Sequence, residues 1–239
     1  MNRKLILRVG WLPLLALFLA ACVRSASSPS PMLESVANRP SPTPGLVSFP
    51  LEPASTWIYE YRAYVEDEQA LWVVTETILS VEKRDGLLLA EVERMASLQE
   101  GQPSAEFFLL PETGTSWYIL RGGDLFRQSE TLAPDDLSKN TRHEMVFPPE
   151  SVPCWPVDDV LGPLEQGASG CRYVSQTLAT YTTPAGEFEN CLELVTPYLS
   201  GAVISVYCPN VGFVAEKHDH NGTPFGYELV LTGYSLPFP

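Results

Sequence analysis

The sequence has few of the residues and none of the short motifs that usually carry catalysis. Its 239 residues include three histidines, His143, His218 and His220, and the patterns G-x-S-x-G, H-E-x-x-H, G-x-G-x-x-G and the P-loop are absent. We interpret His143 as a solvated residue of a polar connection, and His218 and His220 as exposed residues near a turn at Asn221-Gly222. Two histidines do not make a metal site by themselves. These features favour a protein that is not an enzyme and has no cofactor.

Basic residues are also scarce. Lys and Arg together number 15 against 29 Asp and Glu, a net charge of −14. Without residues 1–21, the chain keeps 12 basic and 29 acidic residues and has a net charge of −17. Such a chain repels nucleic acid, so no nucleic-acid partner is expected. The acidic clusters Glu66-Asp67-Glu68, Asp135-Asp136 and Asp158-Asp159 fall in turn-like segments, where carboxylates are solvated.

A hydrophobic run long enough to stay in a bilayer is missing as well. Basic residues precede an apolar run from Val9 to Ala21, which is too short for a transmembrane helix and contains Pro13. No basic stop-transfer cluster follows it. We therefore predict a signal peptide over residues 1–21, with an ordinary secretory signal and a retained membrane helix as weaker alternatives.

The run ends in Leu19-Ala20-Ala21-Cys22, which resembles the lipobox of bacterial lipoproteins. The resemblance implies cleavage before Cys22, a lipid on the Cys22 sulfur, and a further acyl chain such as palmitate on the freed amine. Two or more acyl chains hold a protein stably on a membrane. The expected location is the bacterial cell envelope, with the membrane as a partner through Cys22 and the folded part outside the cytoplasm.

Residues 22–48 are rich in Ser, Pro, Ala and Asn and show no sustained apolar periodicity. Such a segment cannot bury enough apolar surface to offset the entropy of ordering it. We predict a disordered tether with polyproline II character. The remaining residues, 49–239, have the composition of a single globular domain.

This domain is predicted to be all-β. Trp57, Tyr59 and Tyr61 recur at period two and give one aromatic face. We expect a single antiparallel meander curled into a barrel, a half-barrel or a sandwich, with a long irregular middle connection over 147–170 and one helical turn near Pro134. The expected strands cover 57–62, 71–82, 87–95, 105–110, 116–120, 124–128, 171–182, 188–196, 202–207, 211–217 and 227–233.

Four cysteines follow Cys22, and an even number in an exported protein favours disulfides over a metal site, for which C-x-x-C spacing is lacking. A hairpin about the turn Tyr198–Gly201 places Cys191 opposite Cys208, within bridging range. Cys154 is then left to pair with Cys171. Each bridge closes a short loop and is expected to stabilise the fold by about 3 kcal/mol.

Three segments resemble a β-rich domain of uncharacterised bacterial envelope lipoproteins. They are Thr183–Leu192, Tyr207–Val214 and Tyr227–Leu229, and the opening from Phe49 to Tyr59 is also similar. The resemblance implies a fold rather than an activity, since its motifs are turn and packing signatures. It further implies a relation to half-barrels that carry lipids or lipoproteins in bacterial envelopes.

Three hypotheses of function follow. The first is a lipid-anchored, non-enzymatic binding or envelope-structural module, whose partner is an apolar small molecule or an envelope protein. The second is a carrier that shelters an apolar ligand, a lipid or an acyl chain, on a concave face formed by Trp57, Tyr59, Tyr61 and Trp72. The third is a hydrolase whose site is assembled from residues distant in the sequence. No feature of the sequence specifies an oligomeric state.

Overall fold

The computed structural model describes residues 49–122, 124–129, 141–157, 169–222 and 224–237. All of them belong to one compact unit, Pro42–Pro239. The signal peptide, the tether and Cys22 lie outside the described residues, as does the helical turn expected near Pro134. They stay predictions.

Twelve strands form one antiparallel sheet, and the described residues include no α-helix. The strands are β1 (Thr56–Val65), β2 (Glu68–Arg84), β3 (Leu87–Glu100), β4 (Gly114–Arg121), β5 (Asp124–Ser129), β6 (Thr141–Met145), β7 (Trp155–Pro156), β8 (Cys171–Thr183), β9 (Gly186–Tyr198), β10 (Gly201–Cys208), β11 (Gly212–His220) and β12 (Phe225–Ser235). A short 3-10 helix, η2 (Pro149–Ser151), precedes β7. The prediction of an all-β meander is confirmed.

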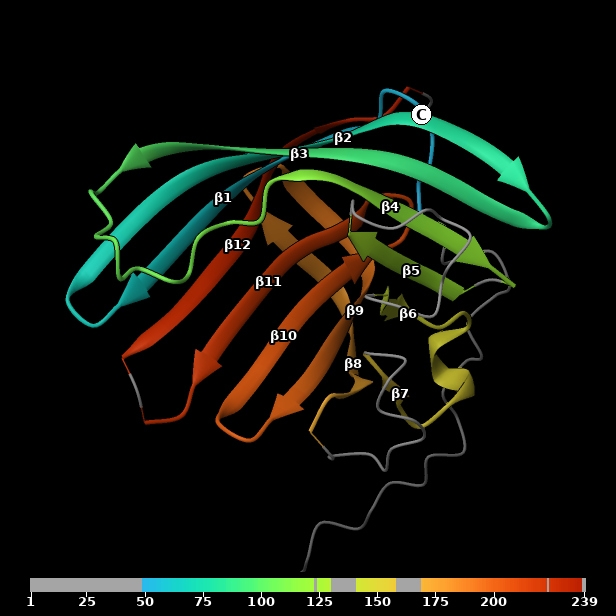
Figure 1. Ribbon diagram of the computed structural model, residues 1–239. Helices are drawn as coiled ribbons and strands as arrows, with labels where there is room; N and C mark the ends of the chain where they lie inside the picture. Colours follow the sequence, from blue (N-terminus) through green and yellow to red (C-terminus); the bar gives the residue numbers. More distant parts are fainter. Residues whose placement is uncertain (1–48, 123, 130–140, 158–168, 223, 238–239) are drawn as a thin grey trace, which may run out of the picture. The chain divides into compact units, whose positions relative to one another are not determined.

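The sheet curls into a nearly closed barrel. Its strand order is β6-β5-β4-β3-β2-β1-β12-β11-β10-β9-β8-β7, so β1 and β12 are neighbours and the two free edges are β6 and β7. Figure 1 shows β2 and β3 arching over one side of the barrel, with β9, β10 and β11 on the other side. Of the three predicted forms, the barrel is the one observed.

The gap between the two edges is bridged by few bonds. The amide of His143 on β6 donates to the carbonyl of Val157, just after β7, at 2.8 Å. The amide of Val157 donates in turn to Gly170 O at 3.0 Å, and the Cys154–Cys171 disulfide ties the β7 segment to β8. The middle connection that the sequence predicted as irregular therefore supplies the closing edge of the barrel.

Period-two patterning places the aromatic residues inside. On β1, Trp57, Tyr59 and Tyr61 are buried in the main hydrophobic core, while the alternate positions face outward. On β2, Trp72 and Ile78 are also buried. A bulge between Ile78 and Ser80 then shifts the alternation by one position. Beyond the bulge, Val81 is partly buried against the core and the other residues of β2 are exposed.

Both disulfides are the pairs expected from the sequence. The β9–β10 register runs from Gly201 opposite Tyr198 to Tyr207 opposite Leu192, and its continuation places Cys191 opposite Cys208. Their Cα atoms are 4.2 Å apart. The second bridge joins Cys154 and Cys171, with Cα atoms 5.7 Å apart.

Three expectations were wrong. Residues 105–110 form no strand, because this segment crosses the barrel rim without a strand partner. The short strands β6 and β7 were not predicted, since polar residues and prolines obscure their alternation. His143 is not solvated: it is 9% exposed and stacks on Phe126, with ring centroids 4.3 Å apart.

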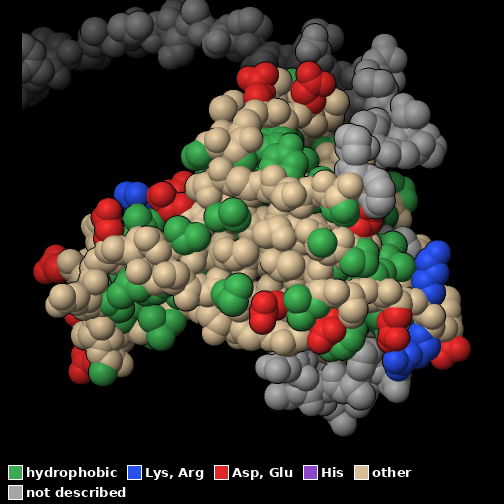
Figure 2. Space-filling model, turned by 90° about the horizontal axis from the view of Figure 1, so that it is seen from above, with side chains coloured by type: hydrophobic (Ala, Val, Ile, Leu, Met, Phe, Trp, Pro, Cys, Tyr) green, Lys and Arg blue, Asp and Glu red, His purple; other side chains and the backbone are tan. Residues whose placement is uncertain are grey.

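The outer face of the sheet carries mixed side chains. Figure 2 shows small separate groups of hydrophobic side chains on the face seen from above, with charged side chains mostly toward its periphery. Leu79 on β2 and Met95 and Leu98 on β3 are among the exposed apolar residues. Scattered exposure of this kind is normal for soluble proteins, so the interior is the more informative place to look for a site.

Candidate functional site

A layer of charged side chains crosses the interior of the barrel. Glu76 on β2 and Arg94 on β3 are direct cross-strand partners, and Arg94 Nη1 lies 3.4 Å from Glu76 Oε1. Arg127 on β5 approaches the same oxygen, with its Nη2 at 3.6 Å. All three side chains are at most 17% exposed. One mostly buried carboxylate oxygen therefore faces two guanidinium groups.

Arg142 extends this layer from β6 toward the other half of the barrel. Its Nε lies 3.3 Å from Glu144 Oε1, and its Nη2 lies 3.6 Å from Glu216 Oε2 on β11. Strands β6 and β11 are not neighbours in the sheet, so this contact spans the interior. Arg142 is the most accessible member of the layer, with 38% of its side chain exposed.

Arg172 on β8 is bound differently. Its Nη1 donates to both the carbonyl oxygen and Oε2 of Glu144, each at 2.9 Å. Its Nε donates to Thr196 Oγ1 at 2.9 Å, and the side chain is 1% exposed. These short, well-aligned bonds join β6 to β8 across the open edge, so Arg172 has a structural role in closing the barrel.

Two of the interior carboxyls, Glu144 and Glu216, are held in their ionised form. Burial alone would raise the pKa of Glu144, but Arg142, Arg172 and Arg127 outweigh it and lower the pKa. The pKa of Glu216 is likewise lowered against the effect of burial, by Arg142 and by the hydrogen bond from the Tyr227 hydroxyl. That bond has an O···O distance of 2.6 Å. Both groups are therefore hydrogen-bond acceptors and not proton donors at neutral pH.

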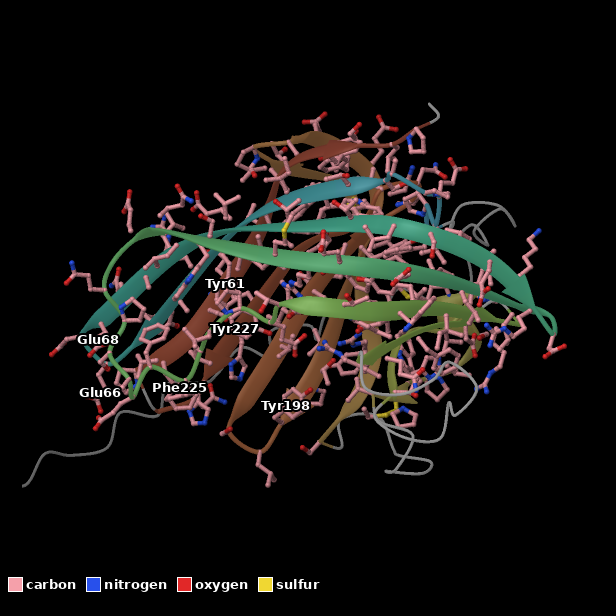
Figure 3. The ribbon with its side chains drawn as sticks, turned by 45° about the horizontal axis from the view of Figure 1, so that its top comes forward. Tyr61, Glu66, Glu68, Tyr198, Phe225 and Tyr227 are labelled. Atoms are coloured by element: carbon pink, nitrogen blue, oxygen red, sulfur yellow. A yellow bond between two sulfur atoms is a disulfide. The ribbon has the colours of Figure 1, made fainter. Side chains whose placement is uncertain are left out.

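Tyrosine rings form the wall beside the charged layer. Tyr61 on β1 and Tyr227 on β12 stack with centroids 5.3 Å apart, and Figure 3 shows the two residues close together. The Tyr59 hydroxyl donates to Phe213 O at 3.0 Å, and the Tyr61 hydroxyl to Leu109 O at 3.3 Å. Burial raises the pKa of Tyr59 and Tyr61 well above the ordinary value. These residues consequently present neutral ring faces to the interior.

Two adjoining cavities lie in this interior. The first, of about 210 Å³, is lined by aromatic and apolar residues together with the charged layer. The second, of about 350 Å³, is lined by Arg94, Arg127 and Arg142 and by the stretch from Glu112 to Ser116. The two share the three arginines and Glu112. Together they give a site that is aromatic at one end and cationic at the other.

A segment without regular structure borders both cavities. We call residues 101–113, which link β3 to β4, the strap (Figure 1, light green). Phe107 anchors it in the core beside Trp72, at 5.8 Å between ring centroids. Phe108 is 60% exposed, and Glu112 lies at the cavity rim. The apolar residues that predicted a strand at 105–110 instead pack the strap against the barrel.

The residues expected to form an apolar ligand face separate into two groups. Tyr59 and Tyr61 line the first cavity. Trp57 is packed in the core and donates its Nε1–H to Val211 O at 2.7 Å. Trp72 packs between Tyr61 and Phe107, with its ring tilted against both. The two tryptophans therefore belong to the hydrophobic core around the cavity and do not line it.

The histidines near the β11–β12 turn are less exposed than expected. His218 and His220 are both half-buried, and the His220 ring lies 4.1 Å from that of Phe225. Within the described ranges, no group of three or more His, Cys, Asp or Glu side chains is arranged to hold a metal ion.

No helix in the described part of the chain has the length and apolar character needed to cross a bilayer.

The arginines of the charged layer were not predicted as site residues. A signal for them exists in the alternation: Arg94 shares its face of β3 with Ala90 and Val92, which are fully buried. Glu76 likewise shares its face of β2 with Trp72 and Val74. The sequence pattern of this layer is therefore a charged residue at a strand position whose neighbours two residues away are apolar and buried.

Comparison with known proteins gives two structural likenesses. No family model matches the chain, and no curated protein matches it in sequence. The crystal structure of a candidate lipoprotein from Parabacteroides distasonis has a TM-score of 0.47 and 14% identity, covering 80% of this chain and 99% of that one. An exported-protein candidate with a YmcC-like fold from Bacteroides fragilis has a TM-score of 0.48 and 12% identity, with the same coverage. The role of the cavities has to be inferred from this chain's own residues.

Proposed function

We propose that the chain is a non-enzymatic binding module of the bacterial cell envelope that holds a small molecule inside its barrel. The observation that carries this proposal is the pair of adjoining cavities, which combine an aromatic wall with three arginines. Ligand sites typically pair an apolar lining with a few convergent polar groups. A purely envelope-structural module would have no need of such an interior.

Two features support a location outside the cytoplasm. The sequence ending in Cys22 resembles a lipobox, and lipid on that cysteine would anchor the chain to a membrane. The barrel carries two disulfides, and disulfides persist mainly in oxidising compartments. We propose that the predicted tether, residues 22–48, presents the barrel away from the lipid surface.

The protonation state of the two carboxyl groups in the cavity, those of Glu144 and Glu216, favours binding over hydrolysis. Glu144 and Glu216 come together in the interior, as a two-carboxyl hydrolase would require. Both have a lowered pKa, whereas a general acid needs a pKa raised toward the working pH. Each also accepts bonds from groups that hold it as a carboxylate. We therefore place the hydrolase hypothesis below the binding hypothesis.

The apolar-ligand carrier is the second candidate, and the aromatic wall of Tyr59 and Tyr61 is the observation that favours it. An acyl chain in the same space would cover the charged ends of the arginines without giving them hydrogen bonds, which is costly in a buried site. The cavity therefore favours a ligand with a polar group over one that is wholly apolar.

Native mass spectrometry of the full chain, purified from its own cells, tests the proposal. We expect a non-covalent small-molecule adduct in addition to any modification of Cys22. Ser116→Leu adds volume to the cavity wall and should abolish the adduct, whereas Ser175→Leu, on the exposed part of β8, should not. An adduct that is absent, or unaffected by filling the cavity, would contradict the proposal.

A further inference from the structure

We infer that the cavity takes a small organic anion, with its charged group among Arg94, Arg127 and Arg142 and its apolar body against the tyrosine wall. This inference rests on the proposed function and specifies the ligand class of the same site. It follows from the sheet register, the charge balance, the unpartnered donors and the cavity size.

The register places two cations against each other. Arg127 on β5 and Arg142 on β6 are direct cross-strand partners, an arrangement that is destabilising for like charges. Arg94 on β3 lies opposite Gly114 on β4, so no side chain from β4 fills the space beside it. Three guanidinium groups therefore border one space, and an anion placed there would relieve their repulsion.

The charge of the lining differs between the two cavities. The first is lined by the three arginines and by four glutamates, Glu76, Glu112, Glu144 and Glu216. The second is lined by the same three arginines and by one glutamate, Glu112, whose side chain is exposed. Among the described residues, the excess of positive charge is therefore at the second cavity, and the anionic group is placed there.

The cavity arginines also have bonding capacity to spare. Their ion-pair distances are 3.3–3.6 Å, longer than the 2.7–2.9 Å or so typical of a charge-assisted hydrogen bond, whereas those of Arg172 are 2.9 Å. Arg94 Nε and Ser116 Oγ are buried with no hydrogen-bond partner among the described residues. Ser116 is 7% exposed and lines the second cavity. Unpartnered donors in a cationic cavity suit an acceptor such as a carboxylate or a phosphate.

The other end of the site selects for an apolar body. Phe49, Tyr59, Tyr61 and Phe213 line the first cavity, and the hydroxyls of both tyrosines are already engaged with backbone carbonyls. An engineered cavity of about 150 Å³ is known to admit benzene. A space of about 210 Å³ continuous with the arginines therefore matches a single ring or a short chain bearing one anionic group.

Isothermal titration calorimetry of the detergent-solubilised full chain tests the inference. The probes are benzoate and hexanoate, their neutral amides benzamide and hexanamide, and inorganic phosphate, which lacks an apolar body. We expect at least one carboxylate to bind about tenfold or more tighter than its amide and than phosphate, since bonds to charged groups are worth more than neutral ones. Arg127→Gln should weaken that carboxylate about tenfold, while Arg62→Gln, an exposed arginine on β1, should leave it unchanged.

The possible failures are distinguishable. If amides bind as tightly as carboxylates, and filling the cavity with Ser116→Leu abolishes both, the anion inference is overturned while the binding function stands. If no probe binds and the chain carries no native adduct, both are overturned. The comparison of carboxylate with amide uses the wild-type chain, so it holds even if Arg127→Gln folds poorly.

Discussion

Arg172 should contribute more to stability than any exposed arginine of the sheet. Its guanidinium makes three bonds of 2.9 Å, to Glu144 Oε2, Glu144 O and Thr196 Oγ1, and they connect β8 and β9 to β6. Arg172→Met removes them and leaves the Glu144 carboxylate, which is 7% exposed, in the interior. Removing one partner of a buried pair costs about 3–5 kcal/mol. Because Arg142 still faces Glu144 at 3.3 Å, we expect about 3 kcal/mol, the lower end.

Urea unfolding followed by tryptophan fluorescence measures this loss, since Trp57, Trp72 and Trp155 are buried. The melting temperature should fall by roughly 6–12 °C for a domain of this size. The control is Arg84→Met. Arg84 and Glu82 are closer, at 2.7 Å, but both are more than 40% exposed, so the change should stay within about 0.5 kcal/mol.

A double-mutant cycle with Glu144→Gln separates the pair from general loss of packing. We expect a coupling energy of about 1–3 kcal/mol between Arg172 and Glu144. An Arg172→Met chain as stable as the Arg84→Met control would refute the assignment of Arg172 to barrel closure. A coupling energy near zero would do the same, because the two side chains would then act independently.

Three other outcomes are expected. Replacing both Cys191 and Cys208 by Ser should lower the free energy of unfolding by about 3 kcal/mol; a variant as stable as wild type in non-reducing urea titrations would contradict the loop-entropy argument. The pKa of Glu216 is lowered in the folded chain, so its carboxylate stabilises the fold above the unfolded pKa of 4.5, and this stabilisation is lost as the pH falls through the lower folded pKa. Glu216→Gln should therefore make the free energy of unfolding fall less steeply with decreasing pH. Glu187→Gln, at an exposed position, should leave this pH dependence unchanged. Cys22→Ser should move the chain from the membrane to the soluble fraction on cell fractionation, and unchanged partitioning would rule out the lipid anchor.

Local patterns were enough to predict much of the fold. Period-two alternation marks β1, and turn residues mark the hairpin between β9 and β10, whose register follows from the turn Tyr198–Gly201. Because the pleat fixes which residues face each other, the Cys191–Cys208 pair follows from that register. These elements depend on neighbours in the sequence, and their signals are therefore contained in short windows.

Elements that depend on distant partners were missed. β6 is short and polar; besides pairing with β5, it is held by Arg172 and Val157, which follow it in the chain. The strap has the alternation of a strand at 105–110, but Phe107 packs against Trp72 in the core and Phe108 packs against Phe225. His143 was predicted to be a solvated residue of a polar connection, because its stacking on Phe126 cannot be inferred from its neighbours in the sequence. In each case the partner is not adjacent in sequence.

The candidate site was missed for a related reason. Acidic and basic residues in a charged sequence are usually solvated, and the acidic turn clusters fit that expectation. Arg94 and Glu76 differ because they share the buried parity of their strands. They form a site only together with Arg127 on β5 and Arg142 on β6. These residues come close because the whole sheet is curled, and a short window of sequence does not contain that information.

The central claim, that the interior arginines bind an anion, is tested most directly by nuclear magnetic resonance of the arginine side chains. The full chain labelled with ¹⁵N-arginine is titrated with benzoate while the Nε–Hε signals are followed. We predict that the signals of Arg94 and Arg127 shift and saturate together, since both line the second cavity, while that of the exposed Arg62 does not move. Unchanged Arg94 and Arg127 signals at saturating benzoate would contradict the claim.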